Sequence, residues 1–168
     1  SDGGKTWPAI IDLEGRVRWE AQLEKEHHEI LPWGDGALMY LSQTTDCPDG
    51  IGETATVVIH ERETQETSWS WSLCQHYTPA NGEDDWDHTN AIDPFPGGGA
   101  LLLSVRNLHQ LFKVDVASGA ILWRLGVQGD FARTDGGVGA PFLRQHAAAR
   151  IGEGRVILFD NGKEGVRE

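Results

Sequence analysis

The hydrophobic positions of this chain fall into short runs that are separated by turns rich in glycine and proline. The clearest run, Ala100–Val105, follows a Pro/Gly turn at residues 93–99. A second run, Gln110–Asp115, leads through the turn Ala117–Gly119 to a third, Ala120–Trp123. Apolar runs of about four to eight residues between turn signals are typical of β-strands. The pattern therefore predicts an all-β protein made of short strands.

A recurring tryptophan shows that these strands belong to a repeat. Trp19, Trp71 and Trp123 are 52 residues apart, and each of them ends a strand-like run. A period of about 50 residues, made of short strands and glycine turns, is typical of β-propeller blades. We therefore predict a β-propeller of four-stranded blades.

The phase of the repeat divides the chain into blades. Residues 5–22 form the tail of one blade, residues 23–75 and 83–127 form two fuller blades, and residues 142–168 begin another. These strands do not close a ring, so we expect the chain to be part of a longer propeller and to be inactive by itself. The alternative is a self-contained β-sandwich in which the tryptophan spacing is a coincidence.

Three histidines follow a parallel count, with spacings of 60 and 58 residues. His28, His88 and His146 each stand shortly before the apolar run of a blade. Equivalent positions of successive blades are related by rotation, so we expect these three side chains at one level around the central channel. Four other histidines do not share this phase and are interpreted as structural or exposed: His27, His60, His76 and His109. His27 is also kept as an alternative to His28.

Three imidazoles around a channel suit either a metal ion or an oxyanion. Arg106, at the end of a predicted strand, and Asn90, two residues after His88, favour the anion, because a guanidinium binds oxyanions and opposes a nearby divalent metal. Each residue also has a structural interpretation. Arg106 could form a salt bridge and Asn90 could cap a turn. The acidic run at residues 84–87 could be a solvated loop or could orient His88.

The net charge limits the classes of partner, and the cysteines bear on metal motifs and on the cellular compartment. The formal net charge is −12, which argues against nucleic acid and anionic membranes as partners, and no apolar run approaches the roughly 18 residues of a membrane span. An anionic substrate would therefore need a local cationic pocket. Cys47 and Cys74 fit no metal or thioredoxin motif. A disulfide in an oxidising compartment and two free thiols both remain open.

At these residues the chain resembles the aryl-sulfate sulfotransferases, a β-propeller family. Four stretches carry the resemblance in order, and the last is the most specific: His27–Pro32; Asp85–Asn90; Leu102–Arg106 continuing to Gly119–Gly126; and Gln145–His146 continuing to Leu158–Gly162. The resemblance implies a six-bladed propeller and transfer of a sulfuryl group from a phenolic sulfate ester to a phenol. It implies no cofactor, no metal and no nucleotide sulfate donor.

The resemblance also assigns roles to individual residues. His146 is implied to be the nucleophile that forms a sulfo-histidine, while His28, His88, Asn90 and Arg106 are implied to bind the sulfate. The implied partners are aryl sulfates and phenols, with no nucleic acid and no membrane, and a homodimer is left open. The implied location is the periplasm or the cell exterior. The stretch Ala147–Arg150 lacks the acidic residue often found there in relatives.

Two alternatives to a sulfotransferase belong to other classes. One is a propeller that serves only as a binding or scaffold module, with site residues that persist without turnover. The other is a metal hydrolase that uses the three histidines as ligands. Turnover of an aryl sulfate would distinguish the sulfotransferase from both alternatives, and metal analysis would identify the metal hydrolase.

Overall fold

The computed structural model describes residues 5–6, 8–24, 26–44, 47, 52–78, 85–134, 141–152 and 154–162. Within these ranges the chain contains β-strands and a short 3₁₀ turn but no α-helix, and no helix there is long and apolar enough to span a membrane. The elements are β1 (Lys5–Thr6), β2 (Ala9–Ile11), β3 (Val17–Glu20), β4 (Leu23–Glu24), β5 (Glu26–Trp33), β6 (Ala37–Thr44), β7 (Thr54–Glu61), β8 (Glu66–Ser72), η2 (Leu73–Gln75), β9 (Thr89–Pro94), β10 (Ala100–Val105), β11 (Gln110–Asp115), β12 (Ile121–Gly126), β13 (His146–Arg150) and β14 (Val156–Phe159).

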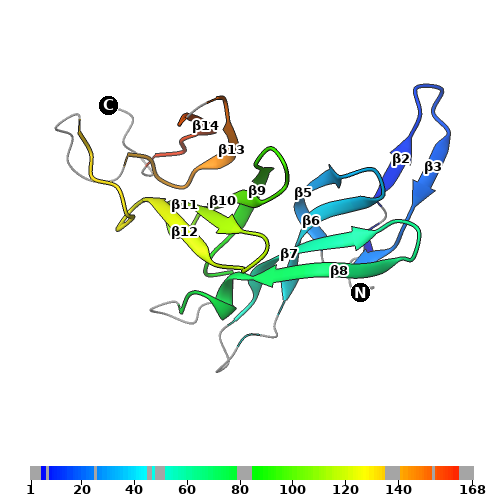
Figure 1. Cartoon of the computed structure of the whole chain (residues 1–168), viewed down its shortest axis with the longest axis horizontal. Helices are drawn as coiled ribbons and strands as arrows, with labels where there is room; N and C mark the ends of the chain where they lie inside the picture. The colour runs from blue at the N-terminus through cyan, green and yellow to red at the C-terminus, as the bar shows by residue number, and fades with distance from the viewer. Residues whose placement is uncertain are drawn as a thin grey trace.

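Two antiparallel sheets of four strands form the centre of the structure. Strands β5 to β8 pair in chain order, as do β9 to β12, and the pairs β2–β3 and β13–β14 lie at either end of the row (Figure 1). This meander confirms the predicted all-β class and the four-stranded unit of a partial β-propeller. Leu23–Glu24, which the sequence assigned to the blade at residues 23–75, pairs instead with β1.

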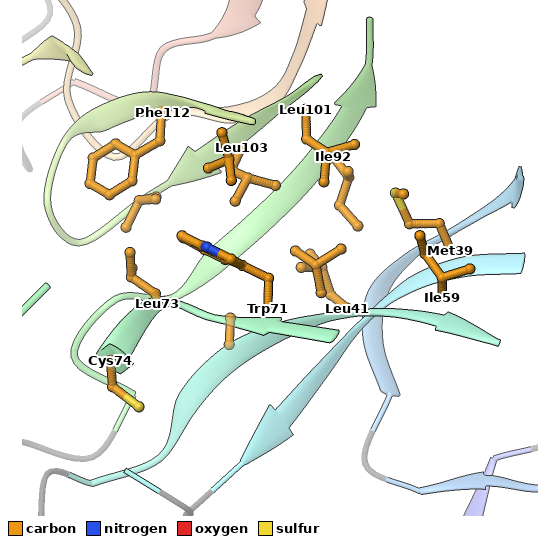
Figure 2. Packing of buried hydrophobic residues seen from close by; sticks show 14 of the residues in the cluster. Met39, Leu41, Ile59, Trp71, Leu73, Cys74, Ile92, Leu101, Leu103 and Phe112 are labelled. Atoms are coloured by element: carbon orange, nitrogen blue, oxygen red, sulfur yellow. The ribbon is translucent and has the colours of Figure 1, made fainter. Parts of the chain in front are cut away.

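The main hydrophobic core fills the space between the two four-stranded sheets. Met39, Leu41 and Ile59 of the first sheet face Leu101 and Leu103 of the second, as Figure 2 shows. Trp71 lies between them with only 4% of its surface exposed. Side chains alternate across each strand, so the opposite face of the second sheet is free to pack against β13–β14. Each sheet is therefore buried by its neighbours.

The repeating tryptophans tie each sheet to the next one. Trp19 of β3 donates from Nε1 to the carbonyl of Arg62, in the turn between β7 and β8. Trp71 of β8 donates in the same way to the carbonyl of Gly119, between β11 and β12, at 2.8 Å. Gly119 has φ of +72°, and a Cβ there would lie 3.3 Å from the Trp71 ring, so this turn requires glycine. The period in the sequence is thus a repeated contact between sheets.

Cys47 and Cys74 form a disulfide, with their Cα atoms 5.7 Å apart. The sequence left this pairing open. Cys74 lies in η2, directly after β8, whereas Cys47 follows β6. The bond therefore fastens the ends of two strands of the first sheet beside the core between the sheets, which Cys47 also contacts.

An apolar groove of about 810 Å³ runs between the second sheet and β13–β14. Phe95, Leu102, Trp123 and Val156 are among the residues that line it. Phe95 follows the end of β9, and Arg150, at the end of β13, also lines the groove. Asn90 and His146, two of the predicted site residues, stand at the beginning of β9 and of β13. The groove is therefore separate from the candidate site.

Candidate functional site

Strands β5, β9 and β13 each carry an irregularity at or close to a predicted histidine, and the one in β9 falls at Asn90, two residues after His88. Strand β5 changes register against β6 between Glu26 and Ile30, and β13 changes register against β14 between His146 and Ala149. Strand β9 does the same against β10 where it meets Ser104 and Val105. Bulges of this kind re-aim side chains and are common beside active sites. They turn each histidine away from the regular direction of its strand.

Backbone dihedrals at these bulges are unusual. His28 has φ of +67°, His88 has φ of +43°, and Ala147, directly after His146, has φ of +50°. Positive φ is uncommon for residues other than glycine, and such conformations gather at functional sites. A residue with positive φ therefore stands at the histidine itself in the first two cases and directly after the histidine in the third.

The three histidines that the sequence predicted come together. The ring centroids of His28 and His88 are 5.1 Å apart, and those of His88 and His146 are 6.4 Å apart, both edge to face. Each ring comes from a different sheet. The side chain of His27, the alternative to His28, lies outside the described residues, whereas the ring of His28 contacts His88 directly.

Carboxylates hold the first strands against one another and so bring the histidines together. Glu29, next to His28, accepts the backbone N–H of Ile92 in β9 at 2.5 Å. Asp93 of β9 accepts the backbone N–H of Arg150 in β13 at 2.6 Å. Burial raises the pKa of the Glu29 carboxyl above its usual range. These links fix the spacing between β5, β9 and β13.

The acidic run before His88 separates into two roles. Oδ2 of Asp85 contacts Nδ1 of His88. This contact orients the His88 ring and leaves its Nε2 as the nitrogen that Asp85 does not engage. Asp87 is buried and accepts hydrogen bonds from the Thr54 hydroxyl and the Ala55 N–H, both in β7, at 3.0 Å. Of the two interpretations left open, the structure supports orientation of His88 for Asp85, while Asp87 anchors the loop to the first sheet. Asp84 lies outside the described residues.

Asn90 joins β9 to the residue before His146. Its Nδ2 donates to the carbonyl of Gln145 at 2.9 Å, and its Oδ1 is buried without a hydrogen-bond partner among the described residues. Gln145 is fully buried and donates to the carbonyls of Val105 and Gln110. Asn90 and Gln145 thus fix the start of β13. Sulfate binding by Asn90 stays a prediction.

Arg106 stands at the end of β10, where its backbone N–H donates to the carbonyl of His88. Its Nη1 donates to Oδ1 of Asn107 at 2.7 Å, and Asn107 in turn donates to the carbonyl of Asp85. The Nε atom is buried and has no hydrogen-bond partner in the described part of the chain. A guanidinium is thus held beside the loop of His88 with one donor unused. Within the described residues Arg106 forms no salt bridge, which was its structural interpretation from the sequence.

The family model for arylsulfotransferase (ASST) matches residues 53–168. The chain belongs to this family. The matched stretch runs from β7 onward and includes His88, Asn90, Arg106 and His146, whereas His28 lies before it. The comparison with curated proteins finds no match. The resemblance expected from the sequence is therefore confirmed, and with it an arylsulfotransferase-type function at the level of the family.

In this arylsulfotransferase site the pKa of His28 depends first on burial and then on the neighbouring imidazoles. Burial lowers the pKa of His28, and the neighbouring His88 and His146 lower it further, while Asp85 opposes them. The free site therefore favours a neutral His28. A bound anion would supply the negative charge that favours its protonated form.

The described residues of the arylsulfotransferase chain include no group of three His, Cys, Asp or Glu side chains placed to hold a metal ion. The three rings approach edge to face, and Asp85 contacts Nδ1 of His88. The choice between a metal hydrolase and a sulfotransferase is left to the metal analysis.

Other histidines of the arylsulfotransferase chain have structural partners. His76 stacks on Trp71, with ring centroids 4.9 Å apart, and His60 is buried in β7. His109 accepts the backbone N–H of Arg144 at Nδ1, at 3.0 Å. His109 therefore supports the turn that leads to His146, and the other two belong to the packing of the first sheet.

One side chain that contacts the predicted nucleophile was assigned no role in the sequence analysis. Nδ2 of Asn161 lies 2.9 Å from Nδ1 of His146 and donates to the carbonyl of Arg144 at 2.8 Å. Asn161 belongs to the Asp-Asn-Gly turn at residues 160–162, after β14. The Asp-Asn-Gly sequence signals a turn at these residues. Asn161 comes to lie beside His146, however, because β13 pairs with β14.

Proposed function

We propose that this protein moves a sulfuryl group from a phenolic sulfate ester to a phenol through a sulfo-histidine on His146. The observation that supports the proposal is the convergence of His28, His88 and His146 from three sheets, with centroids 5.1 and 6.4 Å apart. The family match gives the class of reaction. The geometry offers an imidazole as nucleophile and two others beside it as donors.

The transfer needs a neutral nucleophile and a tolerable leaving group. The Nε2 lone pair of His146 forms a bond to sulfur while the ester S–O bond breaks, and its electron pair leaves with the phenolate. The product is a sulfo-imidazolium that keeps its proton on Nδ1. Because a phenol has a pKa of about 10, the phenolate leaves readily. A second phenol, giving up its proton, reverses the step, so the kinetics are ping-pong.

The neighbouring groups would meet the charge that spreads over the sulfuryl oxygens. Arg106 contributes a permanent cation with an unused donor, and His28 contributes an N–H. His88 is held at Nδ1 by Asp85, which leaves Nε2 as the atom that could exchange a proton with the phenol oxygen. Asn90 is proposed to act through its second N–H, since the first is taken by Gln145.

The proposal predicts a stoichiometric burst. In the complete protein, incubation with nitrophenyl sulfate in the absence of an acceptor should release one phenol per active site and then stop, because the sulfuryl group stays on His146. The protein should gain the mass of one sulfuryl group on the peptide that contains Gln145–His146. Turnover without any labelled histidine, lost on addition of a chelator, would instead favour the metal hydrolase. Binding of aryl sulfates without a burst would favour the scaffold module.

His28 predicts a pH dependence of anion binding. Its pKa in the free site is lowered by burial and by two neighbouring imidazoles, so an anion must be accompanied by a proton to obtain a charged His28. Affinity for inorganic sulfate should therefore increase as pH falls, by at most about tenfold per pH unit for one coupled proton. Calorimetry in buffers of different ionisation enthalpy measures the proton uptake. His28→Asn should reduce that uptake, and equal uptake in both proteins would contradict the assignment.

We also propose a periplasmic or extracellular location and small-molecule partners. The Cys47–Cys74 disulfide supports an oxidising compartment, because such bonds are rare where thiols are kept reduced. The formal net charge of −12 argues against nucleic acid as a partner. Aryl sulfates and phenols remain the partners that fit the site.

A further inference from the structure

The Nδ1 edge of His146 is engaged by two groups of opposite character. Nδ1 lies 3.2 Å from the carbonyl oxygen of Arg144, an acceptor, and 2.9 Å from Nδ2 of Asn161, a donor. Asn161 also donates to that same carbonyl at 2.8 Å. The three groups therefore form a small closed set around one ring nitrogen, on the side of the ring that the proposed chemistry does not use.

Both partners of Nδ1 are themselves fixed in place. The backbone N–H of Arg144 donates to Nδ1 of His109 at 3.0 Å, so Arg144 is held on its other side as well. The carboxylate of Asp160 accepts the N–H groups of Leu143 and Gly162, both at 2.9 Å. The side chains of Asp160 and Asn161 thus join the turn before β13 to the turn after β14. Of these two, Asn161 also contacts the ring of His146.

We propose that Asn161 is a positioning residue for His146. Together with the Arg144 carbonyl it holds the ring by Nδ1 and directs Nε2 toward the site: the carbonyl accepts from Nδ1 when that nitrogen carries a proton, and the Asn161 N–H donates to it when it does not. The proposal rests on the proposed function, since it assigns the attack to Nε2. Which nitrogen of a histidine is available is set by the hydrogen bond that the other nitrogen makes.

The need for two partners follows from the proton balance of the transfer. When Nε2 attacks or carries sulfur, Nδ1 keeps its proton and donates to the Arg144 carbonyl. When the proton is on Nε2 instead, Nδ1 presents a lone pair, and the Asn161 N–H can donate to it. A proton on Nδ1 keeps the sulfuryl group labile, because a neutral imidazole then departs in the second step. Asn161 and the Arg144 carbonyl together therefore hold the ring in one orientation through the whole cycle.

The test compares Asn161→Leu with Asp160→Asn. Leucine has a similar size but removes the amide, whereas asparagine at position 160 retains an oxygen that can accept the two backbone N–H groups. In the substrate-free protein, the ¹⁵N NMR signal of His146 Nδ1 should shift in Asn161→Leu and stay in place in Asp160→Asn. With nitrophenyl sulfate, the burst rate of Asn161→Leu should fall by about 10- to 100-fold, as for other groups that orient a functional histidine, with KM little changed. Asn161→Ala should reproduce both effects.

The two readouts separate the possible failures. An Nδ1 signal that is the same in Asn161→Leu, Asn161→Ala and the wild type would overturn the contact, and an undiminished burst rate would overturn its role. A slower burst that is matched by Asp160→Asn would mean that the turn alone matters, which also rejects the proposal. If the wild type forms no sulfo-histidine, the proposed function fails, while the NMR comparison still decides whether Asn161 fixes the ring.

Discussion

His146→Ala is expected to abolish both the phenol burst and the added sulfuryl mass. Alanine offers no lone pair for attack on sulfur, and the other two imidazoles come from different sheets, with the centroid of His88 6.4 Å from that of His146. The measurement is stopped-flow release of nitrophenol, followed by mass spectrometry of the peptide around residues 145–146. A burst and a label that survive the substitution, or that map to His88, would reassign the nucleophile.

Arg106→Ala is the matched contrast for this experiment. It removes a cation beside the loop of His88 but leaves the nucleophile in place. Loss of one donor that stabilises developing charge typically slows the chemical step by about 10²–10³. The protein should therefore still reach the full label, only more slowly. Complete loss of labelling in Arg106→Ala would mean that this side chain is needed to build the site and not only to stabilise charge.

Trp71→Ala should destabilise the protein by about 3–5 kcal/mol, the usual range for truncating a buried large aromatic side chain. Trp71 is 4% exposed, packs between the two four-stranded sheets and donates to the Gly119 carbonyl. Removal leaves a cavity in the main core and an unpaired carbonyl. Chemical denaturation, followed by tryptophan fluorescence and circular dichroism, measures the change in the free energy of unfolding.

Trp19→Ala is the control for position in the repeat. Trp19 makes the equivalent bond to the Arg62 carbonyl, but it is only partly buried against a smaller cluster. Its loss should therefore cost clearly less than the loss of Trp71. If the two substitutions have equal effects, burial between the four-stranded sheets is not what makes Trp71 important.

The repeat was the part of the fold that the sequence could predict. Trp71 and Trp123 are separated by one period, and each lies on the last strand of a four-stranded sheet. The same rotational argument placed His28, His88 and His146 together, because equivalent positions on successive sheets meet around one axis. Both predictions rely on periodicity, which is present in the linear sequence. The number of blades, six by family resemblance, stays a prediction.

The details of the site depend on features that have no linear signature. The bulges at Asn90 in β9 and directly after His146 in β13 each insert one extra residue, and the alternation of apolar and polar residues does not indicate them. Asn161 reaches His146 only because β13 pairs with β14. Cys47 and Cys74 are 27 residues apart, and they pair because the fold brings the chain after β6 close to η2. These contacts are decided by tertiary packing.

The origin of the three imidazoles in three different sheets has a consequence for how activity responds to remote change. His28, His88 and His146 come from different sheets, which Glu29 and Asp93 link to one another, so the angle between neighbouring sheets affects the distances between their rings. Substitutions in the core between the sheets, many residues away from any reacting atom, would open or close the constellation. Errors of about 1 Å in such geometry can cost about 10²-fold in rate. Catalytic turnover should therefore respond strongly to changes in packing between the sheets. On heating, activity should be lost at a lower temperature than the β-strands unfold.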